Sequence, residues 1–149
     1  MTEPLAPGST IGILGGGQLG RMLSVAASRL GFRCHIYEPG KNPPASDVAH
    51  CVTIAAYDDI TALTAFAHSV DVITYEFENV PVAAAERLQR SVPVYPPPKA
   101  LEVAQDRLTE KRFLNECPSE RLRKRLALAR MVLIRLLFRG SNAVGYSNY

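Results

Sequence analysis

The sequence has 149 residues, of which 47% are hydrophobic and 21% charged, values typical of one globular domain and unlike those of disordered or collagen-like chains. Its net charge of +3 is unevenly distributed. Residues 1–118 carry 10 Lys/Arg against 13 Asp/Glu (net −3), and residues 119–149 carry 7 Lys/Arg against a single acid, Glu120 (net +6). A nucleic-acid function argued from net charge would therefore rest on residues 119–149 alone.

The first predicted element is a strand that runs into a glycine-rich turn and a helix. Ile11 to Leu14 is apolar, Gly15 to Gly17 and Gly20 form the turn, and apolar residues then recur at helical spacing as far as Leu30, before Gly31. Glycines let a backbone approach an anion, and the first amides of the helix point at it. The stretch therefore predicts a phosphate-binding turn, with the Gln18 amide at its mouth.

Strands and helices are predicted to alternate along the rest of the chain. The predicted strands are 33–38, 51–54, 70–75 and 92–95. The predicted helices are one capped by Asp58 or Asp59, one over 82–89, and one over 99–115. This order predicts an α/β protein with a Rossmann-like, open parallel sheet.

Two further segments carry candidate binding residues. Tyr75-Glu-Phe-Glu-Asn-Val-Pro81 follows a predicted strand, so Glu76 and Glu78 are expected at the same sheet edge as the glycine turn. They are candidates to bind sugar hydroxyls or an amine, or to act as acid and base, although Glu78 is equally compatible with a solvent-facing loop. On 105–114, like-charged Arg107 and Lys111 lie four residues apart, which weakly favours an anion between them.

The sequence predicts no catalytic triad and no metal site. His35, His50 and His68 are scattered, and Cys34, Cys51 and Cys117 lack metal-ligand spacing. An odd number of cysteines, with no export signal near the N-terminus, predicts reduced thiols and a cytoplasmic location.

Three segments together resemble the carboxyaminoimidazole ribonucleotide synthetase family of ATP-grasp enzymes: 12–23, 75–81 and 105–114. The resemblance covers residues 10 to about 116. It implies a leading Rossmann-like pre-ATP-grasp domain that binds a ribonucleotide rather than a nicotinamide. It also implies the reaction of aminoimidazole ribonucleotide, bicarbonate and ATP to carboxyaminoimidazole ribonucleotide, ADP and phosphate.

The resemblance also implies roles for individual residues and partners. Gln18 and Leu19 would contact the substrate, Glu76 would bind its sugar or amine end, and Arg107 would reach the ATP phosphates, which Mg²⁺ would bridge. The full-length enzymes are expected to be homodimers, with no nucleic-acid or membrane partner. Residues 1–98 would form the pre-ATP-grasp domain, 99–116 the helical start of the ATP-grasp region, and 117–149 a divergent basic tail that is partly helical or disordered.

The resemblance ends within Asn115-Glu116, where family members usually continue with a segment like Leu-Gly-Ile-Pro-Thr-Ala-Pro. Residues 117–123 can be encoded TGC CCA TCC GAA CGG CTC CGN. One C restored before them gives CTG CCC ATC CGA ACG GCT CCG, which encodes Leu-Pro-Ile-Arg-Thr-Ala-Pro. We therefore hypothesise a single-base deletion after Glu116, which would make residues 117–149 out-of-frame translation. The expected product is a truncated enzyme, inactive by itself.

Two alternatives remain open at this point. The first is a fragment of an NAD-binding domain, since Gly15-x-Gly17-x-x-Gly20 matches the dinucleotide fingerprint and Glu38 has nearly the offset of its ribose partner. The second is a non-enzymatic protein that binds a membrane or nucleic acid through its basic tail.

Overall fold

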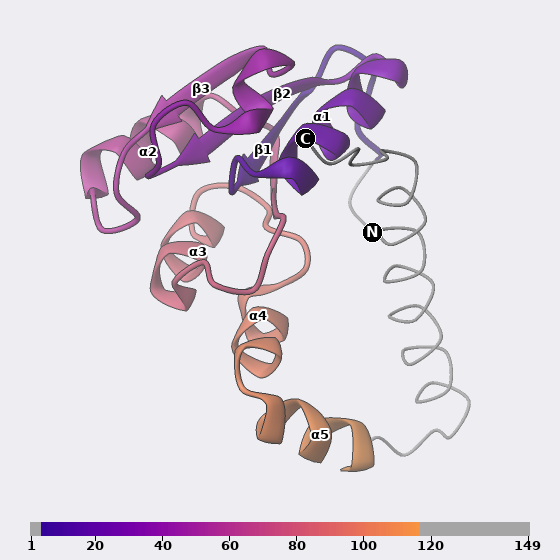
Figure 1. Ribbon diagram of the computed structural model, residues 1–149, viewed down its shortest axis with the longest axis vertical. Coiled ribbons are helices and arrows are strands. Elements are labelled where there is room, and N and C mark those ends of the chain that lie inside the picture. Colours follow the sequence, from indigo (N-terminus) through magenta and orange to yellow (C-terminus); the bar gives the residue numbers. More distant parts are fainter. Residues whose placement is uncertain (1–3, 117–149) are drawn as a thin grey trace, which may run out of the picture. The chain divides into compact units, whose positions relative to one another are not determined.

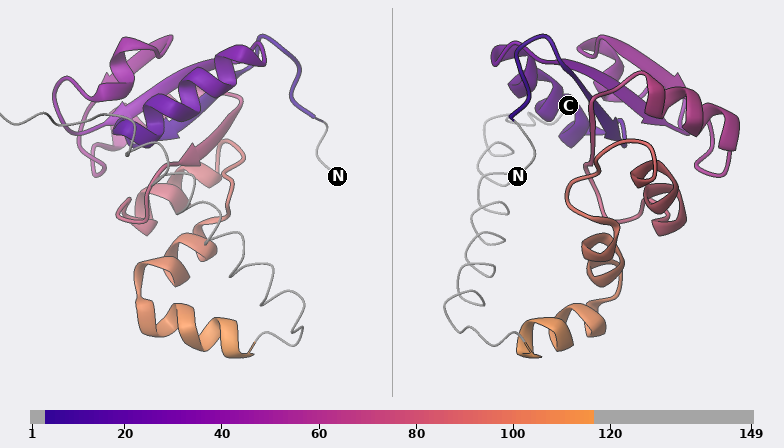
Figure 2. Two further views of the ribbon diagram at one scale, coloured as in Figure 1. Left: turned by 45° about the vertical axis from the view of Figure 1, so that its right-hand side comes forward. Right: turned by 180° about the vertical axis from the view of Figure 1, so that it is seen from behind.

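The computed structural model describes residues 4–116, and its ordered core is a parallel sheet with helices on both sides (Figures 1 and 2). The strand order is β3-β2-β1-β4, where β1 is Thr10–Leu14, β2 Arg33–Glu38, β3 Cys51–Ile54 and β4 Val72–Tyr75. All three strand pairs are parallel. The predicted α/β fold is therefore confirmed, and the predicted strands 33–38 and 51–54 have the observed bounds.

The register of the sheet brings three sequence segments to one edge. Leu14, the last residue of β1, pairs with Tyr37 of β2 and with Tyr75 of β4. Since the strands are parallel, the residues that follow these three positions lie at the same carboxyl edge. Those residues are Gly15, Glu38 and Glu76.

Successive side chains of the strands point to opposite faces of the sheet, and each face contributes to its own apolar cluster. Ile13 of β1 and Cys34 and Ile36 of β2 are buried with Ala45, which lies in the 3-10 helix η1 (Pro44–Asp47). Their neighbours Leu14 and Tyr37 belong to the larger cluster on the other face. That cluster also takes side chains from α2 (Ile60–His68), α3 (Val82–Gln89) and α4 (Pro98–Gln105).

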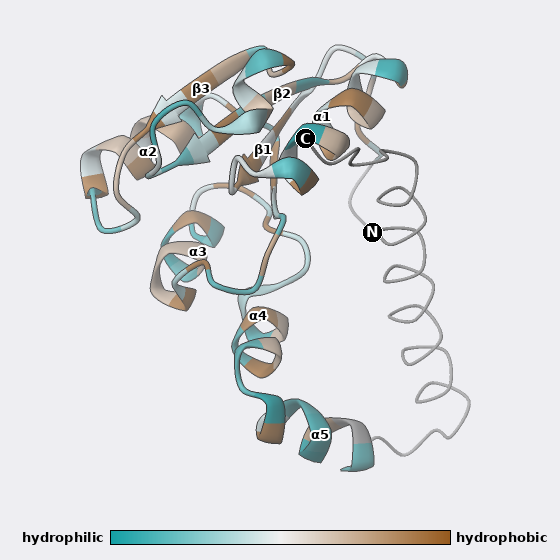
Figure 3. Ribbon diagram, in the orientation of Figure 1, coloured by the Kyte–Doolittle hydropathy of each residue, from teal (hydrophilic) through white to brown (hydrophobic). Residues whose placement is uncertain are grey.

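Helix α1 (Gln18–Arg29) packs on the sheet through small residues rather than through its large apolar ones. Gly20 and Ser24 are its buried residues, and the Ser24 hydroxyl donates to the Gly20 carbonyl at 2.8 Å. Of the apolar positions that recur at helical spacing, Ala27 packs half-buried against the cluster on this face, whereas Met22 is 59% exposed and Leu30, just after the helix, is 69% exposed. Figure 3 shows hydrophobic and hydrophilic segments alternating along this helix.

The structure differs from the sequence prediction after β4 in two places. The predicted strand 92–95 is only an isolated parallel bridge between Ile73 and Val94, because the next donors toward β4 in this register would be Pro93 and Pro97, which have no amide hydrogen. The predicted helix 99–115 is two helices, α4 and α5 (Arg107–Glu116), separated at Asp106, whose backbone is extended. The predicted Asp59 cap of α2 is confirmed, since its carboxylate accepts from the Ala62 amide at 2.9 Å.

The chain divides into two compact units between Asp106 and Arg107, so that α5 belongs to a different unit from the sheet. Within the described residues, no helix is long and apolar enough to cross a membrane. The predicted tail, residues 117–149, lies outside the described residues.

Candidate functional site: the glycine turn and its two glutamates

The glycine turn is held at the carboxyl edge of the sheet by backbone hydrogen bonds to both neighbouring strands. The Gly15 amide donates to the Tyr37 carbonyl at 3.0 Å, and the Glu76 amide donates to the Leu14 carbonyl at 3.1 Å. Gly15 has φ +102°, and a Cβ atom there would lie 2.5 Å from Glu76 Cγ. The turn therefore requires glycine at position 15 for its backbone angle and for the close approach of Glu76.

Glu76 caps helix α1 from the neighbouring strand. Its Oε1 accepts from the Gly17 amide at 2.9 Å, and its Oε2 accepts from the Gly20 amide. Gly17, the N-cap residue, has no side chain to do this. The positive end of the helix dipole also favours a carboxylate at this place. Glu76 therefore joins β4 to the start of α1.

Glu38 binds the same turn from the other side. Its Oε2 accepts from the Gly16 amide at 2.7 Å, and its Oε1 accepts from the Gly40 amide at 2.9 Å. The two glutamates thus use the amides of Gly16, Gly17 and Gly20. The sequence predicts a phosphate-binding turn here; in the structure, these three amides donate to two of the chain's own carboxylates.

The structure brings three of the four predicted site residues together. Gln18 is exposed at the first position of α1, half-buried Leu19 follows it, and the half-buried side chain of Glu76 lies at the same helix end. Arg107 is exposed at the start of α5, in the other unit. Glu78, the other candidate acid, is exposed.

A glutamine that the sequence analysis missed fixes the loop after Glu76. The Gln105 side-chain amide donates to the carbonyls of Glu78 (2.8 Å) and Val80 (2.7 Å). Gln105 belongs to the third family-like segment, and Glu78 to the second, so the two motifs touch. Their shared function in placing the loop was not evident from their spacing in the chain.

Tyr57 is a second residue that the sequence analysis missed. It follows β3 at the carboxyl edge, and its hydroxyl is buried without a hydrogen-bond partner. Burial raises the pKa of Tyr57, and the negative charges of Glu38 and Glu76 raise it further, so the phenol stays protonated. An unsatisfied buried hydroxyl costs about 1–3 kcal/mol. Nothing in its sequence context marks it.

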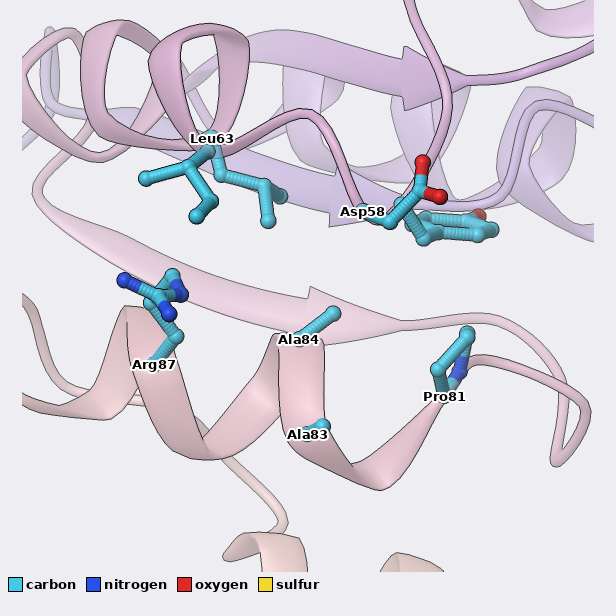
Figure 4. A pocket seen from close by; sticks show the side chains of 8 residues that line it. Asp58, Leu63, Pro81, Ala83, Ala84 and Arg87 are labelled. Carbon is cyan, nitrogen blue, oxygen red and sulfur yellow. The ribbon is translucent and has the colours of Figure 1, made fainter.

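A cavity of about 270 Å³ lies between α2 and α3. Figure 4 shows Leu63 of α2 on one side and Ala83, Ala84 and Arg87 of α3 on the other, with Asp58 and Pro81 at one end. Tyr57 also contributes to the lining. Most of this lining is aliphatic, so the cavity lacks the convergent polar groups that mark a specific ligand site.

The described residues offer no metal centre. Among residues 4–116, no group of three or more His, Cys, Asp or Glu side chains could hold a metal ion.

A glycine turn between a buried strand and a helix, at the carboxyl edge of a parallel sheet, defines a Rossmann-like ligand-binding domain. Residues 8–105 match the ribonucleotide synthetase preATP-grasp domain, and the chain belongs to that family.

Relatives with known names agree with this assignment. The N5-carboxyaminoimidazole ribonucleotide synthase of Brucella melitensis is 61% identical over 112 residues, which is 75% of this chain and 31% of the relative. This chain thus spans about a third of the length of that curated relative.

Solved structures show the same fold. The ADP complex of purK, an N5-carboxyaminoimidazole ribonucleotide synthetase, superposes with a TM-score of 0.74 at 40% identity, covering 78% of this chain and 31% of that one. The Aspergillus clavatus enzyme in complex with ADP and 5-aminoimidazole ribonucleotide has a TM-score of 0.67 at 29% identity, covering 75% and 30%.

Proposed function

We propose that this chain supplies the ribonucleotide-binding edge of an ATP-dependent carboxylation enzyme of purine biosynthesis. The observation that carries the proposal is the position of Glu76: its carboxylate lies at the start of α1, next to Gln18 and Leu19. Family membership supports the substrate class, since a relative of the same fold is described in complex with 5-aminoimidazole ribonucleotide and ADP.

In the proposed reaction, ATP phosphorylates bicarbonate to carboxyphosphate. The amine of aminoimidazole ribonucleotide then attacks the carboxyl carbon, phosphate leaves, and the amine proton is lost. Glu76 would accept hydrogen bonds from the sugar or amine end of the nucleotide, and Gln18 and Leu19 would border it. Arg107 would bind ATP phosphates, because its planar fork matches two phosphate oxygens.

Bicarbonate, Mg²⁺ and a homodimeric assembly are part of the same proposal and come from the family resemblance. Mg²⁺ would neutralise the ATP phosphates, and its ligands would lie outside residues 4–116. Since the chain spans about a third of its relatives, we expect no synthetase activity from these 149 residues alone.

The proposal is tested by calorimetric titration of the purified chain with aminoimidazole ribonucleotide. We expect saturable binding that weakens at least about tenfold in Glu76→Gln, as loss of a hydrogen bond to a charged group allows. Glu78→Gln, which changes an exposed acid two residues away, is the matched control and should bind as the unchanged chain does. Equal affinity in all three proteins would contradict the role of Glu76.

A separate assay tests the expected inactivity. ADP formation is measured with ATP, bicarbonate and the ribonucleotide present together, and none is expected. Formation of ADP that depends on both bicarbonate and the ribonucleotide would show that the chain is catalytically sufficient.

A nicotinamide cofactor is the second candidate, and one observation favours it: Glu38 does face the glycine turn, as a ribose partner must. Against it, Glu38 and Glu76 occupy the amides that a pyrophosphate would need. NAD should therefore leave the thermal unfolding midpoint unchanged, whereas the ribonucleotide should raise it.

A further inference from the structure

The Tyr57 hydroxyl is the one buried side-chain polar atom without a hydrogen-bond partner among residues 4–116. Such groups are rare in folded proteins, and each asks for a physical explanation: a missing water, a ligand, or a functional role. Tyr57 differs in this respect from two nearby tyrosines, whose hydroxyls each have a hydrogen-bond partner. Tyr37 donates to the Ala56 carbonyl at 2.6 Å, and Tyr75 donates to the Pro96 carbonyl at 3.0 Å.

The ring of Tyr57 is held in place by its neighbours. It stacks on Tyr37 with ring centroids 5.6 Å apart and an interplanar angle of 26°. Tyr37 is itself fully buried and packs edge-on against Phe66 at 5.2 Å. The hydrogen bond from Tyr37 to Ala56 also fixes the backbone directly before Tyr57. Because the stacking with Tyr37 and the fixed backbone restrict rotation of the Tyr57 ring, its hydroxyl stays buried rather than hydrated.

The charged groups around this hydroxyl indicate which kind of ligand group could accept its hydrogen bond. Tyr57 follows β3; Glu38 ends the adjacent strand β2, and Glu76 follows β4 further along the same carboxyl edge. Both glutamates act on the phenol electrostatically and keep it protonated, so it is a donor. A phosphate or carboxylate partner would be repelled by two carboxylates. A sugar hydroxyl is neutral, and it can accept from the phenol while donating to a glutamate.

We propose that Tyr57 is a further ligand-binding residue of this edge, whose hydroxyl donates a hydrogen bond to a ribose hydroxyl of the bound ribonucleotide. This inference rests on the proposed function. The hydroxyl is covered in the unliganded chain, so binding includes a movement of half-buried side chains at the turn. Glu38 and Glu76 are the candidates, because both accept hydrogen bonds from the turn and both act electrostatically on the phenol.

The test combines stability and affinity in Tyr57→Phe. Because the phenol has no protein partner to lose, the thermal unfolding midpoint of the unliganded variant should equal or exceed that of the unchanged chain. Its affinity for aminoimidazole ribonucleotide should fall about 3- to 10-fold, the effect of one neutral hydrogen bond. Tyr75→Phe is the matched control with the opposite pattern: a lower midpoint, because a satisfied hydroxyl is removed, and unchanged affinity.

Deoxy analogues of the ribonucleotide identify the partner. The effect of Tyr57→Phe should vanish for the 2′-deoxy or the 3′-deoxy analogue, because one of them lacks the hydroxyl that Tyr57 binds. A lower midpoint in unliganded Tyr57→Phe would show that the phenol already has a partner and would overturn the inference. So would unchanged affinity, or an effect that persists with both analogues. If the unchanged chain binds no ribonucleotide, the proposed function fails first and the inference with it; if it binds and Tyr57→Phe binds equally, only the inference fails.

Discussion

Gly17 and Glu76 lie 59 residues apart in the chain and are joined by a 2.9 Å hydrogen bond from the Gly17 amide to Glu76 Oε1. The same carboxylate also accepts from the Gly20 amide. One side chain on the loop after β4 thus satisfies two amides at the start of α1, a task that a local N-cap residue performs in most helices. The glycine turn and the motif at 75–81 form a single structural unit.

Removal of the Glu76 carboxylate should destabilise the fold. Glu76→Ala leaves the Gly17 and Gly20 amides without their acceptor, so we expect the free energy of unfolding to fall by about 1–3 kcal/mol. Urea denaturation followed by circular dichroism measures this. Glu78→Ala should change the same free energy by less than about 0.5 kcal/mol, since Glu78 is exposed. Equal effects of the two substitutions would show that the capping bonds contribute nothing.

Alanine substitutions at two glycines with positive φ should distinguish the cost of backbone strain from the cost of a steric clash. Gly8 (φ +94°) has open space around the position of a Cβ, whereas a Cβ on Gly15 (φ +102°) would meet Glu76 and Phe77 at 2.5 and 2.9 Å. Gly8→Ala should therefore cost about 1–2 kcal/mol from strain alone. Gly15→Ala should cost clearly more, because Glu76 must also leave its place. Similar unfolding midpoints for the two variants would contradict the close approach.

Stability should depend on pH through His35. This residue is buried between the hydroxyls of Ser69 and Thr53, both 2.8 Å from its ring nitrogens. Burial lowers the pKa of His35, and the charge of His50 lowers it further. The unfolded chain therefore binds this proton more readily, so the contribution is fully present above about pH 6.5 and is lost as the pH falls below it.

Denaturation of the unchanged chain and His35→Gln at pH 7.5 and 5.5 checks this. The unchanged chain should lose up to about 1.4 kcal/mol per pH unit more than the variant, which has no proton to bind at that position. Parallel losses in the two proteins would assign the pH dependence to other groups.

Two cysteines should differ in reactivity. Cys34 is buried on β2, and burial raises the pKa of its thiol although a hydrogen bond with Ser24 opposes this, whereas Cys51 is exposed on β3. Iodoacetamide at pH 8 should label Cys51 at least about tenfold faster than Cys34, because the thiolate is the nucleophile. Peptide mass spectrometry measures the two sites separately. In urea, where the chain is unfolded, the two labelling rates should become similar. Similar labelling rates in the folded protein would contradict the burial of Cys34.

Local patterns were enough to predict most elements of this fold. Arg33–Glu38, Cys51–Ile54 and Val82–Gln89 have the predicted bounds, since alternation and helical spacing are properties of short segments. The strand predicted at 92–95 is only a single bridge, because apolar content does not report that Pro93 and Pro97 lack the amide hydrogens that would extend it. The break at Asp106 was not predicted, because the residues on both sides of it are compatible with one continuous helix over 99–115.

The site was predictable in its location but not in its contacts. The order of strands places Glu76 and the glycine turn at one edge, so both were expected there. That Glu38 and Glu76 fill the turn depends on the register of β1 against β2 and β4, which no local pattern specifies. The burial of the Tyr57 hydroxyl likewise depends on packing between segments distant in sequence.

The small contact residues of α1 have a practical consequence for work with this chain. Gly20 and Ser24 attach the helix to the sheet, so Met22, Leu23 and Val25 contribute little to the core and add apolar area to the surface. Replacing these three with lysine or glutamate should improve recovery of protein from expression without altering the fold. The side of α1 away from the sheet is thus the natural place to engineer solubility, or to attach a fluorophore for the titrations above.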